Sequence, residues 1–325
     1  MKRLLAVNAL WTGLVLVVLV AVFGALRPDA VLTVFTLQTT LVETSVLLVL
    51  AVGMTYVIVT SGIDLSVGSV LVFSGVTSAM VMNALNGGDA TEAGWGTVAV
   101  GLAVALGSGA AWGLLNGLLV ARAGLPPLIV TLGSFGAALG AGQLLSNGSN
   151  VSGVPTVLGN GLGTGTWFGV PNLVLVAAAV TAVGALVLGG TVFGRHTYAI
   201  GSNEEAARRA RIPVTRRLVQ VYLLAGVLAG LAGFMALAYF RVASITGHDT
   251  DNLNAIAAVV LGGTSLFGGT GSVVGTVLGV FIPAVLRKGF VIVGVNVYWQ
   301  PIAVALVLVA AVWFDQSRRK ARNRR

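Results

Sequence analysis

Long apolar stretches separated by short polar breaks run along almost the whole chain. Most are close to the ~20 residues that a helix needs to cross a bilayer. We place them near Leu4–Leu26, Leu37–Thr60, Leu65–Leu85, Trp95–Ala121, Leu128–Ser146, Pro171–Thr191, Leu218–Phe240, Asn252–Leu261, Ser272–Phe290 and Tyr298–Phe314. The pattern therefore predicts an all-α integral membrane protein, a bundle of about ten transmembrane helices.

Two of these segments differ from the rest. Leu4–Leu26 follows Lys2 and Arg3, as the apolar part of a signal peptide does. It exceeds the usual ~7–15 apolar residues of such a peptide, and no clear cleavage site follows it, so we expect a retained first span. Asn252–Leu261 is too short to cross a bilayer alone. We expect a broken or re-entrant helix there, which is tolerated only inside protein.

Composition agrees with lipid as the main surroundings. Hydrophobic residues make up 56% of the 325 residues and charged residues 9%, whereas soluble domains carry about 25% charged residues. The 45 glycines suit close packing of helices in lipid, and the absence of cysteine excludes disulfides and thiolate metal sites. We predict a single transmembrane domain over residues 1–325. The net charge of +9 comes from basic residues at helix ends and in the tail, where membrane topology explains them, and no nucleic-acid partner is expected.

Basic residues predict the orientation. With the amino terminus in the cytoplasm and alternating crossings, most of the 19 Lys and Arg residues fall on the cytoplasmic side, as the positive-inside rule expects. That side receives Lys2, Arg3, Arg122, the arginines from Arg195 to Arg217, and the basic tail 316–325. The outer side receives Arg27, Arg241, Arg287, Lys288, Asp29, Asp89, Glu92, Asp249 and Asp251. Both termini are therefore expected in the cytoplasm.

The polar segment from Arg195 to Arg217 predicts a short cytoplasmic helix. Its residues are Asn203, Glu204, Glu205, Ala206, Ala207, Arg208, Arg209 and Ala210. Asn203 is a favoured N-cap, the glutamates lie in the first turn and pair with arginines four residues later, and Pro213 ends the helix near Ile212. The alanines form a small-residue face. This helix could dock on a cytoplasmic partner, or it could be a solvated loop helix.

Four polar side chains within or beside the spans are candidates for a translocation path: Glu43, Asp64, Asn116 and Thr131. A charged carboxylate deep in a bilayer costs at least ~2.5–3.5 kcal/mol, so Glu43 is expected to face the bundle or the outer water. Asp64 could lie at the mouth of the path or cap the helix that begins near Leu65. Asn116 and Thr131 could line the path or form hydrogen bonds between helices.

Nothing in the sequence favours an enzyme. The glycine-rich run Gly262–Gly271 lacks the Lys-Ser/Thr ending of a phosphate-binding loop and predicts a tight turn between helical pieces. The two histidines, His196 and His248, are expected in loops on opposite sides of the membrane. We therefore expect no catalytic residue, no cofactor and no metal site.

Five motifs resemble the ribose/xylose/arabinose/galactoside permease family of ATP-binding-cassette importers. They are the runs Gly53–Ser69, Gly113–Gly117, Pro126–Gly133, Tyr198–Ala207 and Ala255–Ser265, which occur in the family's order over nearly the whole chain. The sequence departs from the family at Ala210-Arg211, where Ser-Gly is common, and at Arg287-Lys288, where uncharged residues are common. Those two cations could contact an anionic feature of a binding protein or extend to lipid headgroups.

The resemblance implies a function and partners. The chain would be the permease subunit of a bacterial sugar importer in the inner membrane and would not hydrolyse ATP itself. It would pair with a second copy or a related permease, with a cytoplasmic ATPase of two fused nucleotide-binding modules, and with a periplasmic or lipid-anchored sugar-binding protein. The Asn203–Ala210 helix would be the coupling helix. Alternatives are import of nucleosides, autoinducer sugars or branched-chain amino acids, an ion-coupled secondary carrier, or a structural membrane protein.

Overall fold

A computed structural model of the chain describes residues 2–248, 250–296, 298–299, 302 and 305–306. Its elements are α1 (Lys2–Leu26), α2 (Pro28–Val31), α3 (Val34–Val59), α4 (Val67–Ala84), α5 (Trp95–Ala121), α6 (Pro127–Leu145), α7 (Thr156–Leu158), η1 (Gly159–Gly163), β1 (Thr166–Trp167), β2 (Val170–Pro171), α8 (Asn172–Gly190), α9 (Val192–Ser202), α10 (Glu204–Arg209), α11 (Val214–Phe240), α12 (Asp251–Leu261) and α13 (Val273–Val293). Most of the predicted span Tyr298–Phe314, the tail 316–325 and Asp249 lie outside the described residues.

The predicted all-α membrane fold is confirmed. Within the described residues, seven helices are long and apolar enough to span a membrane: α3, α4, α5, α6, α8, α11 and α13. Two shorter apolar helices accompany them, the Trp11–Leu26 part of α1 and α12. The antiparallel pair β1–β2 is the only sheet found in the described part of the chain. The apolar pattern thus predicted the positions of these spans.

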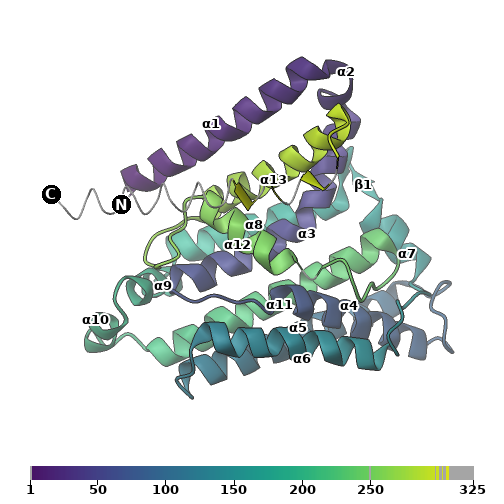
Figure 1. The fold of residues 1–325 in the computed structure, drawn as a ribbon. Coiled ribbons are helices and arrows are strands. Elements are labelled where there is room, and N and C mark those ends of the chain that lie inside the picture. The colour runs from purple at the N-terminus through teal and green to yellow at the C-terminus, as the bar shows by residue number, and fades with distance from the viewer. Residues whose placement is uncertain (1, 249, 297, 300–301, 303–304, 307–325) are drawn as a thin grey trace.

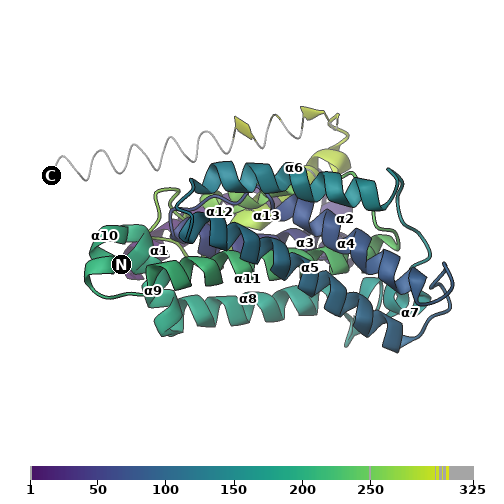
Figure 2. The same cartoon turned by 90° about the horizontal axis from the view of Figure 1, so that it is seen from below.

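The spans run roughly alongside one another and give the molecule two distinct ends. Figures 1 and 2 show α9 and α10 at one end, together with the beginning of α1. The same figures place α7 at the other end, with β1 and α2 also there in Figure 1. The first end carries the arginines of α9, α10 and the beginning of α11, and we call it the arginine-bearing end.

Helix α3 lies in the middle of the bundle. It is apolar on all sides over most of its length, and such a helix is stable only when other helices surround it. Its side chains Leu50, Met54 and Tyr56 are almost fully buried. The Tyr56 hydroxyl donates to the Gly184 carbonyl of α8, and the hydroxyls of Thr55 and Thr276 of α13 lie 2.7 Å apart. Helices α5, α6 and α8 bury much less of their surface, as lipid-facing spans do.

Helices α5 and α11 cross at glycines. A Cβ atom built on Gly113 would lie 2.4 Å from the Tyr222 carbonyl oxygen, and one on Gly226 would lie 2.2 Å from the Gly109 carbonyl oxygen. Real Cβ atoms do not approach backbone oxygens so closely, so only glycine permits this crossing. Close backbone approach supplies the van der Waals contact that holds helices together in lipid, where the hydrophobic effect does not.

Two helices begin inside the bundle. After α3 ends, the backbone is non-helical until α4 begins at Val67, and it is again non-helical between α11 and α12. The two starts meet: Asn252 Nδ2 donates to the Leu65 carbonyl at 2.9 Å. A Cβ on Gly68 would lie 2.6 Å from the His248 carbonyl oxygen. A short helix is therefore present where Asn252–Leu261 was expected to be a broken or re-entrant helix, and it begins against the start of α4.

This junction corrects two sequence-based placements. His248 and Asp251 were expected in an outer loop, but they lie where α12 begins, against the start of α4. The segment after α11 turns back into the bundle, and hydropathy cannot detect this because the segment is short and polar. The positive-inside rule counts charges at loops and gives no signal for a loop that folds inward.

Candidate functional site

The predicted loop helix is present as α10. The Asn203 side chain accepts a hydrogen bond from the Ala206 amide at 2.9 Å and is its N-cap. Arg208 pairs with Glu204 at 2.7 Å, and Arg209 pairs with Glu205. The four charged side chains are largely exposed, so these pairs contribute at most ~1 kcal/mol each to stability. They leave a charged, accessible surface at the arginine-bearing end.

Two details of α10 differ from the sequence prediction. The helix ends at Arg209, before the predicted stop near Ile212, because Arg211 adopts a left-handed conformation with φ 59°. Ala207 is buried at 3% exposure in a cluster with Ile200, Val214 and Leu218. The alanines therefore do not form one open face. Ala207 anchors α10 to the bundle, and Ala206 and Ala210 remain exposed.

Helix α9, which the sequence interpretation missed, links α10 to the core. Gly201 lies one turn before α10, and a Cβ on it would lie 1.7 Å from the Val59 carbonyl oxygen at the end of α3. The Ser61 hydroxyl donates to the Gly201 carbonyl at 3.2 Å and to the Phe267 carbonyl at 2.9 Å. The Gly269 amide donates to Val59 at 2.9 Å. The end of α9, the end of α3 and the predicted glycine turn Gly262–Gly271 therefore form one tight junction.

Two of the four candidate path residues, Asp64 and Asn116, belong to one buried hydrogen-bond network, and Thr131 bonds to the residue before Asp64. Asp64 Oδ1 accepts hydrogen bonds from the Ser66 amide at 2.8 Å and the Ser66 hydroxyl at 2.6 Å. Asn116 Nδ2 donates to Ser66 Oγ at 2.9 Å, and Ser134 donates to Asn116 Oδ1. The Thr131 hydroxyl donates to the Ile63 carbonyl at 3.1 Å. The network joins α5 and α6 to the non-helical segment before α4.

The network encloses Asp64, whose exposure is 1%. Its carboxylate accepts a hydrogen bond from the amide of Ser66, two residues later, and so forms an Asx-type turn just before α4. The assigned N-cap of α4 is Ser66 rather than Asp64. Asn116 lies about 8 Å along α5 from its end at Ala121, so Asp64 lies near the arginine-bearing end of the bundle but inside protein.

Glu43, the fourth candidate, lies elsewhere. It forms an ion pair with Lys288 of α13 at 2.9 Å, and the side chains are 49% and 25% exposed. The two residues are far apart in sequence, so no local pattern could have predicted the pair. Glu43 is about 13 Å along α3 from Val34, which is within the depth of the hydrocarbon. A half-exposed ion pair at that depth is unfavourable against lipid, so water or protein must cover this face.

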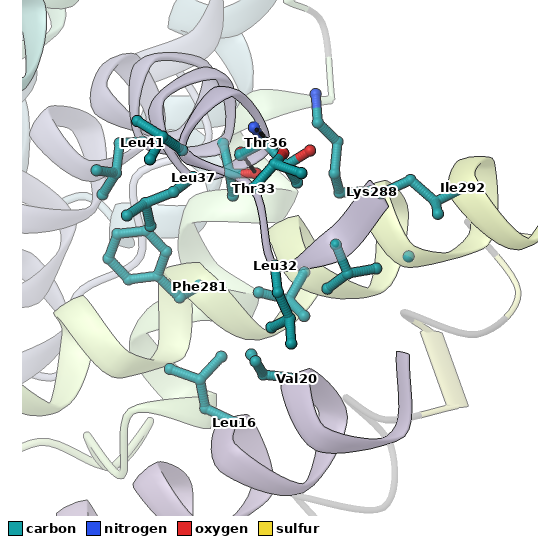
Figure 3. Close-up of a pocket in the computed structure, with 15 residues that line it drawn as sticks. Leu16, Val20, Leu32, Thr33, Thr36, Leu37, Leu41, Phe281, Lys288 and Ile292 are labelled. Atoms are coloured by element: carbon teal, nitrogen blue, oxygen red, sulfur yellow. Dashed lines mark hydrogen bonds between the residues drawn. The ribbon is translucent and has the colours of Figure 1, made fainter. Parts of the chain in front are cut away.

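An apolar pocket of about 450 Å³ adjoins this pair, between α1, α2, α3 and α13. Figure 3 shows Leu16, Val20, Leu32 and Phe281 around it, and it shows the Lys288 amino group pointing away from it. Its threonines are already engaged: the Thr36 hydroxyl, for example, donates to the Ala30 carbonyl at 2.7 Å. The pocket therefore offers hydrocarbon walls and few free hydrogen-bonding groups, which does not suit a polar cargo.

The titratable groups outside the spans include one loop carboxylate with a lowered pKa. Asp89, in the loop between α4 and α5, accepts from the Thr91 hydroxyl and from the Thr91 amide at 2.8 Å. These bonds stabilise the charged form of Asp89 and hold its pKa below the ordinary value. Within the described part of the chain, no group of three or more His, Cys, Asp or Glu side chains could hold a metal ion.

Comparison with known proteins extends over nearly the whole chain. Residues 36–312 match the family described as branched-chain amino acid transport system / permease component. The ribose import permease protein of Escherichia coli K12 is 39% identical over 310 residues, which cover 93% of this chain and 92% of that protein. The fructose import permease protein of Rhizobium meliloti is 34% identical and covers 94% of this chain and 85% of its own length. The L-arabinose transport system permease protein of Escherichia coli K12 is 34% identical, with 84% and 80% covered. No solved structure matches the chain.

Proposed function

Because this chain belongs to the permease family of the branched-chain amino acid transport system type, we propose that it is the membrane-spanning subunit of a bacterial ATP-binding-cassette importer for a monosaccharide. The observation that carries the proposal is the similarity of nearly the whole chain to import permeases named for three different monosaccharides. A second permease, a cytoplasmic ATPase with two fused nucleotide-binding modules and a sugar-binding protein complete the proposed assembly.

In this proposal the arginine-bearing end faces the cytoplasm, with both termini on that side, and α10 is the contact for the ATPase. Three features support the contact. The helix is short and capped, its charged side chains are exposed, and Ala207 fixes it to the bundle. A displacement of α10 acts first on Gly201, which has no free space against Val59. Motion at the ATPase is therefore passed to α3 and to the glycine turn that precedes α13 in the chain.

The candidate path residues take two roles in the proposal. Asp64, Asn116 and Thr131 hold the non-helical segment before α4 against α5 and α6, and so keep the path closed near the cytoplasmic end in this conformation. Glu43 with Lys288 lines the outer part of the path, because its partial exposure needs a polar neighbour. Opening toward the cytoplasm would separate the buried network and expose Asp64.

Uptake measurements test the proposal. We expect deletion of the gene to reduce uptake of at least one of labelled D-ribose, D-fructose and L-arabinose, and we expect the restored gene to recover it. The purified chain alone, in liposomes with a proton or sodium gradient, should not accumulate the same sugar. Accumulation by the chain alone would identify an ion-coupled carrier and contradict the importer.

A second cargo belongs in the same panel. The family description names branched-chain amino acids, so labelled L-leucine is the alternative that the comparison itself raises. The three relatives reported above are named as permeases for sugars. We therefore expect leucine uptake to be unchanged by the deletion, and its loss in place of sugar uptake would reassign the cargo.

A further inference from the structure

The described residues between α11 and α12, 241–248 and 250, form irregular backbone at membrane depth, and part of this backbone is exposed. Thr246, Gly247 and Thr250 are exposed, and a Cβ atom on Gly247 would have open space around it. Lipid cannot satisfy irregular backbone groups, so such backbone is tolerated at membrane depth only inside protein or beside a water-filled cavity. These residues are not inside the protein. Water or a second protein chain must therefore cover them, and a path for a polar cargo would supply the water.

The depth of this segment follows from the two helices that begin beside it. Helix α12 has 11 residues. It rises about 16 Å before it reaches the glycine turn at the arginine-bearing end. On the other side, Gly68, which contacts the His248 carbonyl, lies about 24 Å along α4 from Ala84. The hydrocarbon core of a bilayer is about 30 Å thick, so His248 and Asp251 lie near its middle.

Polar and aromatic side chains gather at this point. His248 Nδ1 lies 2.7 Å from Asp251 Oδ2, and the side chains are 15% and 19% exposed. Asn254 Nδ2 donates to Asp251 Oδ1 at 3.4 Å. The Phe240 ring, which is 53% exposed, lies with its centroid 6.0 Å from that of His248. None of these side chains takes part in the Asp64 network or in the Glu43–Lys288 pair.

We propose that His248, Asp251, Asn254 and Phe240 form a transit site for the cargo midway through the membrane, and this rests on the proposed import of a monosaccharide. The hydroxyl groups of a sugar both donate and accept hydrogen bonds. Asp251 accepts them, Asn254 does both, and the exposed part of the Phe240 ring can contact the apolar C–H face of the sugar. A small number of placed polar groups beside an aromatic wall is the usual composition of a small-molecule site.

Helix geometry also suits this location. Transporters place cargo near the midplane, where discontinuous helices begin. The site lies at the start of α12 and against the start of α4. Because the site offers few hydrogen-bonding side chains, it would hold sugar weakly, which permits rapid release.

Thiol labelling tests the site in the assembled importer, since the chain has no cysteine of its own. Leu253, beside the site, is 57% exposed, and Leu186 on α8 is 70% exposed in the structure. We expect a charged methanethiosulfonate reagent to modify Leu253→Cys at least about tenfold faster than Leu186→Cys, because a thiol ionises in water and not in lipid. An excess of the transported sugar should slow the modification of Leu253→Cys alone.

Uptake by site variants gives an independent measurement. Asp251→Asn and Asn254→Ala should change the ratio of uptake rates among D-ribose, D-fructose and L-arabinose, at unchanged amounts of protein in the membrane. The matched control Asp89→Asn lies in an outer loop and should leave the ratio unchanged. A purely structural role would lower all three rates together.

The outcomes separate the two proposals. If the unmodified protein transports sugar but Leu253→Cys reacts as slowly as Leu186→Cys, or if the uptake ratio is unchanged in both site variants, the transit site is wrong and the importer stands. If the unmodified protein transports none of the sugars, the proposed function fails and the transit site fails with it.

Discussion

Buried polar side chains in this molecule form hydrogen bonds with backbone segments that are not helical. Asp64 binds the amide and hydroxyl of Ser66, and Asn116 connects that hydroxyl to α5. In a helix the backbone supplies its own partners. The amides of residues 60–62 still donate to carbonyls of α3, but the Ser66 amide donates to the Asp64 side chain. Buried groups without partners cost roughly 1–3 kcal/mol each, so side chains must supply them.

Replacement of Asp64 by leucine should lower stability. The change leaves the Ser66 amide without its acceptor, and we expect the free energy of unfolding to fall by about 1–3 kcal/mol. Asp64→Asn keeps an oxygen in place and should cost less. Thermal unfolding of the purified protein in detergent measures both.

Asp89→Leu is the matched control for this change, because Asp89 binds the amide and hydroxyl of Thr91 in the same way in an exposed loop. Water can replace the lost acceptor there, so the unfolding temperature should shift little. Equal shifts for Asp64→Leu and Asp89→Leu would contradict a role for burial.

At the scale of the elements, glycine determines how closely the spans approach. Gly113 of α5 should not tolerate alanine, because its Cβ would lie 2.4 Å from the Tyr222 carbonyl oxygen. We expect Gly113→Ala to destabilise by about 1–3 kcal/mol through overpacking. Gly136 of α6 has open space around it. Gly136→Ala should therefore be neutral or stabilising by up to ~1 kcal/mol. The unfolding temperatures of the two variants in detergent give the comparison, and similar losses would exclude the crossing as the cause.

The sequence predicts elements better than contacts between them. Apolar length located the spans from Leu37 to Phe290, and capping chemistry located α10, because both signals are local. The inward turn before α12 was missed, since polar residues such as His248 and Asp251 occur equally in an outer loop. The Glu43–Lys288 pair was missed because tertiary folding alone brings residues from α3 and α13 together. Asp64 and Asn116 were predicted as candidates, but their shared network was not.

Helix α10 is the proposed contact for the ATPase, and a charge reversal on it tests that role. Glu205→Arg reverses an exposed charge and breaks the pair with Arg209, which contributes at most ~1 kcal/mol to stability. The helix should therefore persist while the surface offered to the ATPase changes. We expect ATPase activity to continue while sugar uptake falls by about tenfold or more, as loss of roughly 1.4 kcal/mol of coupling would produce.

Glu92→Arg makes the same charge reversal in an outer loop, where Glu92 is exposed, and should leave the amount of sugar transported per ATP unchanged. Both variants should reach the membrane in normal amounts, as immunoblots of membrane fractions can show. Normal coupling in Glu205→Arg would argue against α10 as the ATPase contact.

At the scale of the whole molecule, the proposed mechanism depends on orientation. The arginine-bearing end must face the cytoplasm if α10 is to meet a cytoplasmic ATPase, and the outer loops must face the binding protein. The charge distribution supports this arrangement, because Arg122 and the arginines from Arg195 to Arg217 lie at one end of the bundle. The transit site midway between the ends then lies on the route from one partner to the other.

Single cysteines in the naturally cysteine-free chain test the orientation directly. Ser149 is exposed after α6, and Ala210 is exposed after α10 at the opposite end. In right-side-out membrane vesicles, a membrane-impermeant maleimide should label Ser149→Cys and spare Ala210→Cys, because a charged reagent does not cross the hydrocarbon. Inverted vesicles should give the reverse pattern, and detergent should make both accessible. Labelling of Ala210→Cys from outside would place α10 beyond reach of the ATPase, and the coupling role proposed for it would fail whatever the cargo.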